Sequence, residues 1–169
     1  KRDRAARPVF FRNPPPKMTS LLSDLRSGVR TLTFNRPERA NAFNFELIAS
    51  LLRALDEASR DPQTRVLVLT GAGATFGAGH DVTEMLEGAG KVSYREHLQK
   101  TYNPLILKIR QIEKPVIAAV EGHAVAGGLE LALWCDLRVA SETAVFGVFC
   151  RRWGVPLIDG GTVRLPRLI

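Results

Sequence analysis

The sequence predicts an α/β domain in which strands and helices alternate along the chain. Two apolar, β-branched runs, RVLVLT at 65–70 and PVIAAV at 115–120, are typical of buried strands. Apolar residues also recur at helical spacing over 45–58 and again over 127–134. Because helices that alternate with buried strands pack on the faces of a sheet, this order indicates a layered α/β architecture.

The first half of the domain has the order strand, helix, strand. Residues 29–34 (VRTLTF) alternate between apolar and polar side chains, as a strand with one buried face does. The helix is expected to begin after Asn44, a good N-cap residue, and to end at Asp61 and Pro62. The strand at 65–70 follows, and the glycine-rich residues 71–79 are expected to form a long loop.

The second half repeats the alternation. We expect a short turn of helix at 82–86, a flexible break at 87–90, and a helix at 93–112 that Pro104 kinks or divides. The remaining elements are strands at 115–120 and 137–140, a helix from Gly127, and a loop after Phe146 that packs on the core.

Size and composition fit one globular domain with a sizeable core. The chain has 169 residues, 45% of them hydrophobic, and a mean hydropathy of -0.04. The cysteines, Cys135 and Cys150, make no disulfide framework, which favours a reducing, cytoplasmic compartment. Charged residues such as Glu121 and Glu130 interrupt the longest apolar stretch, so no membrane partner is expected.

The net charge of +7 is concentrated at the start of the chain. Residues 1–17 carry +5 and the rest of the chain carries +2, so a basic folded face for nucleic acid is not expected. Residues 1–20 are predicted to be a basic, proline-rich, disordered leader, and residues 21–169 the folded core. An organelle transit peptide, which would place the protein in an organelle matrix, stays open, although three consecutive prolines oppose an amphipathic helix.

The segment 121–136 (EGHAVAGGLELALWCD) predicts a backbone anion site. Its glycine pair lies between a strand and a helix, where the first helical N–H groups have no partner and the helix dipole is positive. Such donors stabilise an oxyanion by roughly 3–4 kcal/mol each. Glu130, one turn along, would face the same point as a proton carrier. Taken alone, the glycine pair also fits close packing of the helix on the strand, and Glu130 a satisfied helix carboxylate.

Other motifs fail on spacing. The glycine-rich loop after 65–70 has Phe76 where a dinucleotide fingerprint requires glycine, and neither a P-loop nor a serine nucleophile elbow occurs. His80, Asp81 and Glu84 lack a further ligand at suitable spacing, so no metal is expected. Cys150 has no histidine nearby in the sequence and is not expected to be a nucleophile.

Taken together, several ordered segments resemble the enoyl-CoA hydratase/isomerase family, the crotonase superfamily. The resemblance implies a crotonase-like spiral of repeated ββα units, an acyl-CoA substrate, no separate cofactor because coenzyme A belongs to the substrate, and a homotrimer or dimer of trimers. It also implies that further C-terminal helices are missing from a truncated chain. The matching segments are NRPERANAFN at 35–44, TGAGATFGAGHDVTEM at 70–85, KPVIAAVEGHAVAGGLELALWCDLRVAS at 114–141, FG at 146–147 and GVPLIDGGTVRLPRLI at 154–169.

The resemblance also implies roles for individual residues. The N–H groups of Ala78 and Gly127 would bind the thioester oxygen, and Glu130 would be the first acid/base carboxylate of a hydration or double-bond isomerisation. The residues expected to bind the substrate, mostly along its CoA portion, are Arg39, Ala40, Ala42, Ala78, Gly79, His80, Asp81, Val82 and Gly127.

One position departs from the family pattern. Cys150 stands where hydratases have a second glutamate, and Asp159, nine residues on, is the candidate second carboxylate. The departure keeps two alternatives open: a non-catalytic CoA-ester-binding or scaffold paralogue, and a C–C bond hydrolase of the same superfamily.

Overall fold

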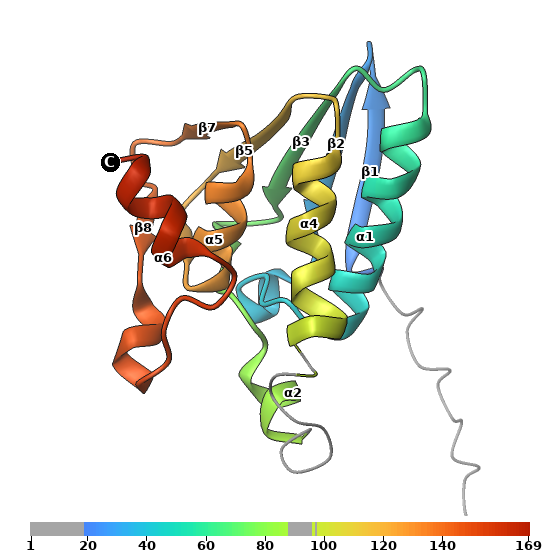
Figure 1. Ribbon diagram of the computed structural model, residues 1–169. Coiled ribbons are helices and arrows are strands. Elements are labelled where there is room, and N and C mark those ends of the chain that lie inside the picture. The colour runs from blue at the N-terminus through green and yellow to red at the C-terminus, as the bar shows by residue number, and fades with distance from the viewer. Residues whose placement is uncertain (1–18, 88–95, 97) are drawn as a thin grey trace, which may run out of the picture.

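A computed structural model of the chain describes residues 19–87, 96 and 98–169 (Figure 1). Its strands form two sheets, a five-stranded sheet in the order β1-β2-β3-β5-β7 and a three-stranded sheet in the order β4-β6-β8. The strands are β1 Leu21–Arg26, β2 Val29–Phe34, β3 Val66–Gly71, β4 Thr75–Gly77, β5 Val116–Val120, β6 His123–Val125, β7 Leu137–Ala140 and β8 Val145–Gly147. The α-helices are α1 Phe45–Arg60, α2 Val82–Glu87, α4 Asn103–Gln111, α5 Gly127–Trp134 and α6 Gly161–Arg164. Shorter helical segments are η1 Pro37–Arg39, η2 Leu98–Tyr102, η3 Phe149–Trp153 and η4 Leu165–Arg167.

The large sheet confirms the predicted alternation of strands and helices. β1 and β2 form an antiparallel hairpin, and the β2–β3, β3–β5 and β5–β7 pairs are all parallel. Parallel neighbours need a crossover, and α1, α4 and α5 lie in the connections between them. α1 and α4 pack side by side against the face of the sheet (Figure 1). The apolar strand residues therefore meet the apolar helix faces in one core.

Helix α1 shows how the sequence positions that core. Asn44 caps it, because its side-chain oxygen accepts from the N–H of Leu47 at 3.0 Å, and the helix ends at Arg60 as predicted. Its apolar stripe is buried against Leu32 and Phe34 of β2 and their neighbours in the core. The buried helix residues are Leu47, Ile48, Leu51, Leu55 and Ala58.

The small sheet was not predicted. β4, β6 and β8 have three residues each, and β4 lies inside the segment expected to be a loop. All of their pairings are parallel, with a register shift between Thr75 and Gly77. This sheet carries the loop that leads to Gly79 and the turn that leads to Gly127, so it brings the two halves of the anion site together.

Three predictions concern segments near the chain ends or the gaps. Residues 1–18, 88–95 and 97, which include most of the predicted leader and the first part of the expected 93–112 helix, lie outside the described residues. The chain divides near Pro104 as expected, into η2 and α4. Residues 19 and 20, assigned to the leader, belong to the fold, because Asn35 donates to both of their carbonyls at 3.0 and 2.7 Å.

Among the described residues, no helix is both long and apolar enough to cross a membrane.

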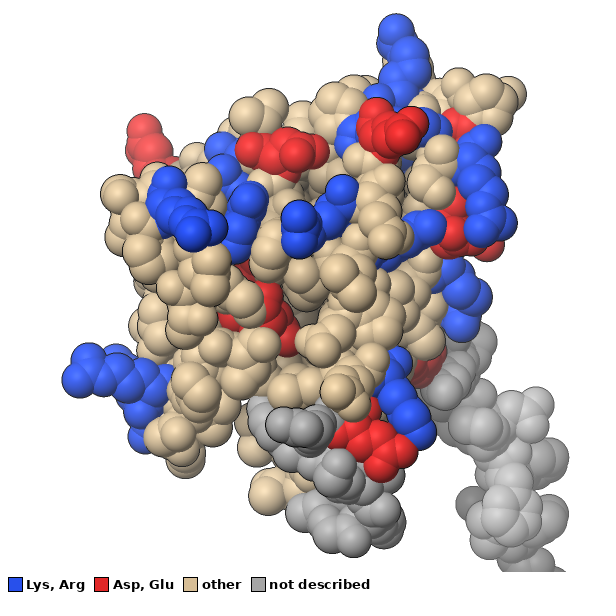
Figure 2. Space-filling model, viewed as in Figure 1, with Lys and Arg blue, Asp and Glu red and all other residues tan. Residues whose placement is uncertain are grey.

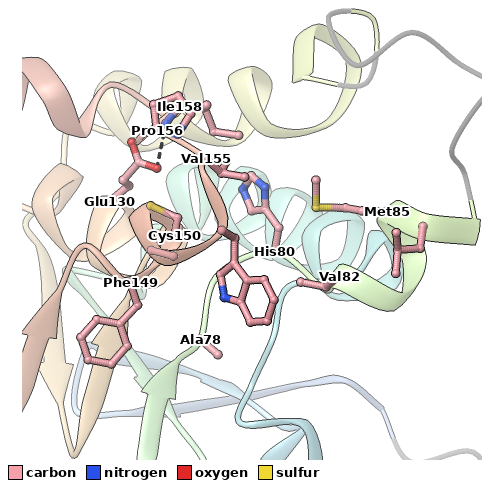
Figure 3. A pocket seen from close by; sticks show the side chains of 14 residues that line it. Ala78, His80, Val82, Met85, Glu130, Phe149, Cys150, Val155, Pro156 and Ile158 are labelled. Carbon is pink, nitrogen blue, oxygen red and sulfur yellow. Dashed lines mark hydrogen bonds between the residues drawn. The ribbon is translucent and has the colours of Figure 1, made fainter.

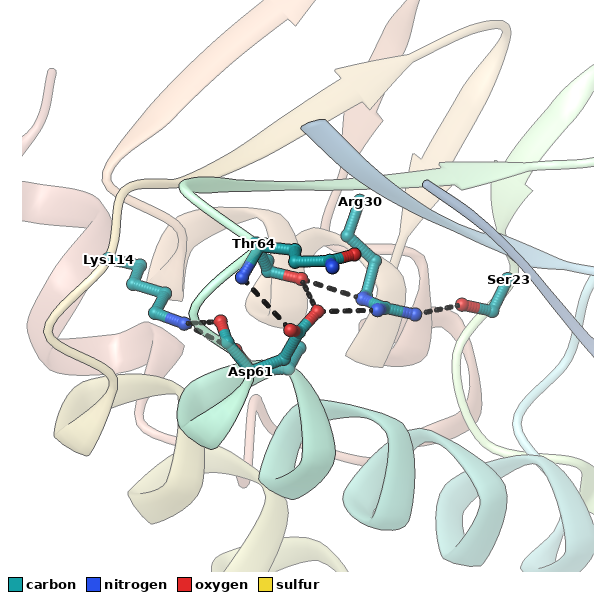
Figure 4. Close-up of polar contacts among 7 residues, drawn as sticks. Ser23, Arg30, Asp61, Thr64 and Lys114 are labelled. Carbon is teal, nitrogen blue, oxygen red and sulfur yellow. Dashed lines mark hydrogen bonds and ion pairs between the residues drawn. The ribbon is translucent and has the colours of Figure 1, made fainter. Parts of the chain in front are cut away.

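A polar network joins the C-terminal end of α1 to the sheet (Figure 4). Arg30 of β2 donates to Thr64 Oγ1 at 2.9 Å and to Asp61 Oδ2 at 2.8 Å, and Lys114 donates to the Asp61 carbonyl at 2.7 Å. Hydrogen bonds from Thr64, then from the Gln63 N–H and Arg30, lower the pKa of Asp61 to about 2. The network therefore fixes the start of β3 and β5 relative to α1.

Candidate functional site

Helix α5 begins where the glycine-rich loop after β4 and the turn after β6 touch. A Cβ on Gly128 would lie 2.1 Å from the Gly77 carbonyl oxygen, so only glycine fits there. A Cβ on Gly79, whose φ is +92°, would lie 2.8 Å from the Gly127 nitrogen. The glycines thus serve close packing, one of the alternatives left open by the sequence, and that packing places the Gly79 loop against the first N–H of α5.

The hydrogen bonds of this loop correct the prediction for Ala78. Its N–H donates to the Ala40 carbonyl at 3.1 Å and is therefore already used. Phe43 forms a parallel bridge opposite His80, donating to the Gly79 carbonyl at 2.7 Å and accepting from the Asp81 N–H at 3.0 Å. In a parallel bridge of this kind, the N–H of the residue opposite Phe43, which is His80, points away from Phe43. In the described part of the chain, the N–H groups of His80 and Gly127 donate no hydrogen bond.

Glu130 is buried on α5 and points toward the turn before α6. It is 1% exposed and accepts from the N–H groups of Asp159 and Gly161 at 2.8 Å and of Ile158 at 3.2 Å (Figure 3 shows the last). Burial, and then the negative charge of Asp159, raise the pKa of Glu130 from 4.5 to about 7, although the three N–H bonds oppose this. A carboxyl group with this pKa can both take up and release a proton near neutral pH.

Asp159 lies behind the wall of the cavity rather than in it. Its Oδ2 lies 3.0 Å from His80 Nε2, and its carbonyl accepts from Trp134 Nε1 at 2.6 Å. Its Oδ1 is buried and has no hydrogen-bond partner among the described residues. The structure therefore does not present Asp159 as a second carboxylate facing the cavity, which corrects the simplest form of that prediction.

The site opens into an apolar cavity of about 570 Å³ (Figure 3). Glu130, His80, Cys150, Ala78 and Gly127 contribute to its wall. The rest of the wall is mainly apolar and includes Val82, Met85, Leu86, Val155, Pro156 and Ile158. Glu130 is the one carboxylate in the described wall, so an uncharged chain bound here would place its carbon atoms beside a single acidic group.

Cys150 shares that wall with Glu130. Burial, and then the negative charge of Glu130, raise the pKa of the Cys150 thiol above its ordinary value of 9.0. The thiol is therefore uncharged at neutral pH and does not replace a carboxylate. Cys135 is fully buried in the core and forms no disulfide with any described residue.

The predicted CoA-contacting residues lie on two neighbouring segments, of which the one that contains Val82 contributes to the cavity wall. Arg39 and Ala40 are exposed on the turn before α1, and Arg39 donates to Thr83 Oγ1 at 3.2 Å. Val82, 63% exposed, starts α2 directly after Asp81. The other predicted positions, Ala42, Gly79 and His80, lie between these two segments or in the loop that joins them to the cavity.

Arg36 holds these segments together and was missed by the sequence interpretation. Its guanidinium pairs with Asp81 Oδ2 at 2.9 Å and donates to the Ala42 carbonyl. Burial alone would raise the pKa of Asp81, but the hydrogen bond from Arg36, then its charge and the N–H groups of Thr83 and Glu84, together outweigh burial, and the pKa ends below its ordinary value. Arg36 and Pro37 could be seen in the sequence as a turn after β2. The residue that Arg36 binds, Asp81, lies 45 residues further along the chain and could not be identified from spacing.

Comparison with known proteins shows which family the chain matches. The sequence model described as enoyl-CoA hydratase/isomerase matches residues 24–169. The 1,2-epoxyphenylacetyl-CoA isomerase of Escherichia coli (strain K12) is 40% identical over 153 residues, covering 89% of this chain and 58% of that protein. The 2,3-dehydroadipyl-CoA hydratase of the same organism is 38% identical, covering 90% of this chain and 58% of that protein.

Solved structures give the same match. A putative enoyl-CoA hydratase/isomerase from Mycobacterium abscessus superposes with a TM-score of 0.83 at 32% identity, covering 88% of this chain and 58% of that one. An enoyl-CoA hydratase from Bacillus anthracis gives a TM-score of 0.80 at 35% identity, covering 89% of this chain and 58% of that one. The chain thus spans about 58% of the length of these relatives.

Proposed function

This chain belongs to the enoyl-CoA hydratase/isomerase family and has the crotonase-like fold predicted from its sequence, and on that premise we propose that it transfers protons on an acyl-CoA thioester. The reaction passes through a thioester enolate. The observation that carries the proposal is the placement of the unused His80 and Gly127 N–H groups beside the buried carboxyl group of Glu130.

The chemistry follows from that placement. The thioester oxygen accepts from the two N–H groups, which makes the α-carbon hydrogens more acidic. Glu130 removes one of them, the C–H electron pair moves toward the carbonyl, and the resulting enolate oxygen is stabilised by roughly 3–4 kcal/mol per donor. A base whose pKa lies close to neutral pH suits this step, because it is present in both forms.

Double-bond isomerisation fits this site better than hydration. Hydration uses one carboxylate to activate water and another to move the α-proton. Cys150, whose thiol is uncharged, occupies the place of the second, and Asp159 is turned toward His80. The relatives at 40% identity include one named a 1,2-epoxyphenylacetyl-CoA isomerase and others named probable enoyl-CoA hydratases, so the preference for isomerisation rests on the site and not on these names. Hydration is therefore the second candidate.

The remaining assignments extend the proposal to the whole protein. Coenzyme A lies along the exposed turn with Arg39, Ala40 and Ala42 and along Val82, which lead into the cavity. The protein assembles as a homotrimer in the cytoplasm. Exposed apolar side chains on the edge strand β7, Leu137 at 58% and Val139 at 65%, support self-association.

Turnover of enoyl-CoA esters tests the proposal. The protein is incubated with 3-enoyl-CoA and 2-enoyl-CoA esters of different chain length, and formation or loss of the conjugated thioester is followed by absorbance. We expect 3-enoyl-CoA to gain conjugation, and Glu130→Gln to lose turnover while it still binds the ester. Binding without turnover by the unmodified protein would instead favour the CoA-ester-binding alternative, and cleavage of a carbon–carbon bond the hydrolase alternative.

A further inference from the structure

His80 is held in the cavity wall by two contacts that fix its ring. Nε2 lies 3.0 Å from Asp159 Oδ2, and the ring stacks on Tyr102 at 3.5 Å between centroids and 18° between planes. The His80 side chain is 9% exposed and the Asp159 side chain 5% exposed. His80 lines the cavity, whereas Asp159 lies behind it, so a bound acyl chain meets the imidazole and not the carboxylate.

The backbone N–H, the carbonyl and Oδ2 of Asp159 all have partners, and Oδ1 has none in the part of the chain that the structure describes. Its N–H donates to Glu130 at 2.8 Å and its carbonyl accepts from Trp134 at 2.6 Å, so its backbone position is fixed. Arg164 lies over the Trp134 ring, 4.8 Å from its centroid, and stabilises that contact. With Oδ1 unpartnered, His80 is the side chain that Asp159 binds in the described structure.

This arrangement leaves one ring nitrogen for chemistry. A buried carboxylate that accepts from one imidazole nitrogen fixes the tautomer and the orientation of the ring. With Nε2 on Asp159, Nδ1 is the nitrogen that can exchange a proton, and no described residue forms a hydrogen bond to it. A Cβ on Gly127 would lie 3.0 Å from His80 Cδ2 and 3.1 Å from Nε2, so this edge of the ring lies next to the N–H proposed to bind the enolate oxygen, and Nδ1 lies on the opposite edge.

Resting on the proposed function, we infer that the His80 imidazole, oriented by Asp159, is the second proton-transfer group of this site and takes the place of a carboxylate at position 150. The neighbouring ionisable groups are Glu130, Cys150 and Tyr102. Of these, Glu130 works at the α-carbon and the Cys150 thiol is uncharged at neutral pH.

The two groups complete an isomerisation without any other reactant. Glu130 takes a proton from C2 of a 3-enoyl thioester, and the electron pair spreads over the dienolate held at the His80 and Gly127 N–H groups. The protonated ring of His80 then gives its Nδ1 proton to C4. The new C–H bond leaves a conjugated 2-enoyl thioester, and the proton on Glu130 returns to His80 through solvent.

Two reactions measured on the same variants separate this inference from the proposed function. Exchange of the α-protons of hexanoyl-CoA in deuterium oxide, followed by proton NMR, needs Glu130 and the enolate site. Isomerisation of 3-hexenoyl-CoA, followed by absorbance, also needs the second group. In His80→Gln, which keeps the backbone N–H of residue 80, we expect kcat for isomerisation to fall about 100-fold and the exchange rate to fall by at least about tenfold less than that.

Asp159→Asn is the second variant, and it keeps the His80 ring in place. We expect its isomerisation kcat to fall at least about tenfold and by more than its exchange rate, because an amide does not fix the tautomer of the ring, whereas exchange changes only through the Asp159 charge that acts on Glu130. The exposed residue His123 on β6 gives the matched control, His123→Gln, with both rates unchanged.

Each other outcome is decisive. Unchanged isomerisation in His80→Gln, or a parallel loss of both reactions in a folded variant, overturns the role of His80 and leaves the proposed function standing. Absence of exchange in the unmodified protein overturns the proposed function and this inference with it.

Discussion

Replacing Glu130 by glutamine should change how the stability of this protein depends on pH. In the folded protein, burial and then the Asp159 charge raise the pKa of Glu130 from 4.5 to about 7. A group that binds its proton more tightly when folded gives stability that is fully present below the unfolded pKa. That stability is lost as the pH rises through the folded pKa.

The magnitude follows from the two pKa values. Each pH unit between them lowers the free energy of unfolding by about 1.4 kcal/mol. Unfolding of the unmodified protein should therefore become about 3 kcal/mol easier from pH 4.5 to about pH 7. Glutamine does not titrate, so the variant lacks this decrease. Its amide nitrogen also cannot accept from the Ile158 N–H, which adds a pH-independent cost of about 1–3 kcal/mol.

Urea unfolding between about pH 5 and pH 8 measures the effect. The control is Glu113→Gln, a change at an exposed carboxyl outside the site, which should keep the decrease seen in the unmodified protein. If Glu130→Gln loses stability with pH as steeply as the unmodified protein does, then the carboxyl group of Glu130 is not held in the environment described above.

Three further predictions concern the scaffold around the site. Arg36→Met leaves the buried Asp81 carboxylate without its partner, so urea unfolding should show that the free energy of unfolding falls by about 3–5 kcal/mol. The same change at the exposed Arg26 should lower it by less than about 1 kcal/mol. Equal losses in the two variants would contradict the role of Arg36. Asp61→Asn removes stability that is present above pH 3.8 and lost as the pH falls through about 2, so thermal unfolding should separate variant from parent at neutral pH and bring them together near pH 2. Gly128→Ala forces α5 away from β4 and should lower the melting temperature by about 5–10 °C, and an unchanged melting temperature would show that the contact is loose.

The sequence predicted the elements that carry a long or clear hydrophobic pattern. The runs that became β3 and β5 have four and five consecutive apolar residues, and the α1 stripe repeats at helical spacing between a cap and a proline. β1 was missed because most of its side chains are exposed and show no alternation. β4, β6 and β8 were missed because three residues are too few to show a period, and their pairing depends on segments far apart in the chain.

In the site, too, local sequence patterns could be predicted and contacts between distant segments could not. Gly127 and Glu130 could be predicted because a strand, a turn and a helix follow one another in the sequence. The pairing of His80 with Asp159 could not, because it joins residues 79 positions apart. The choice between the Ala78 and His80 N–H groups depends on the bridge to Phe43, a backbone register that side-chain patterns do not encode.

Proton exchange at the α-carbon tests the central claim most directly. Hexanoyl-CoA has no double bond to hydrate or move, so exchange of its α-protons in deuterium oxide reports enolate formation alone. The structure predicts that the unmodified protein catalyses this exchange and that Glu130→Gln, still folded and still binding the ester, is slower by at least about 100-fold. Exchange that survives unchanged in Glu130→Gln would contradict the assignment of Glu130 as the base.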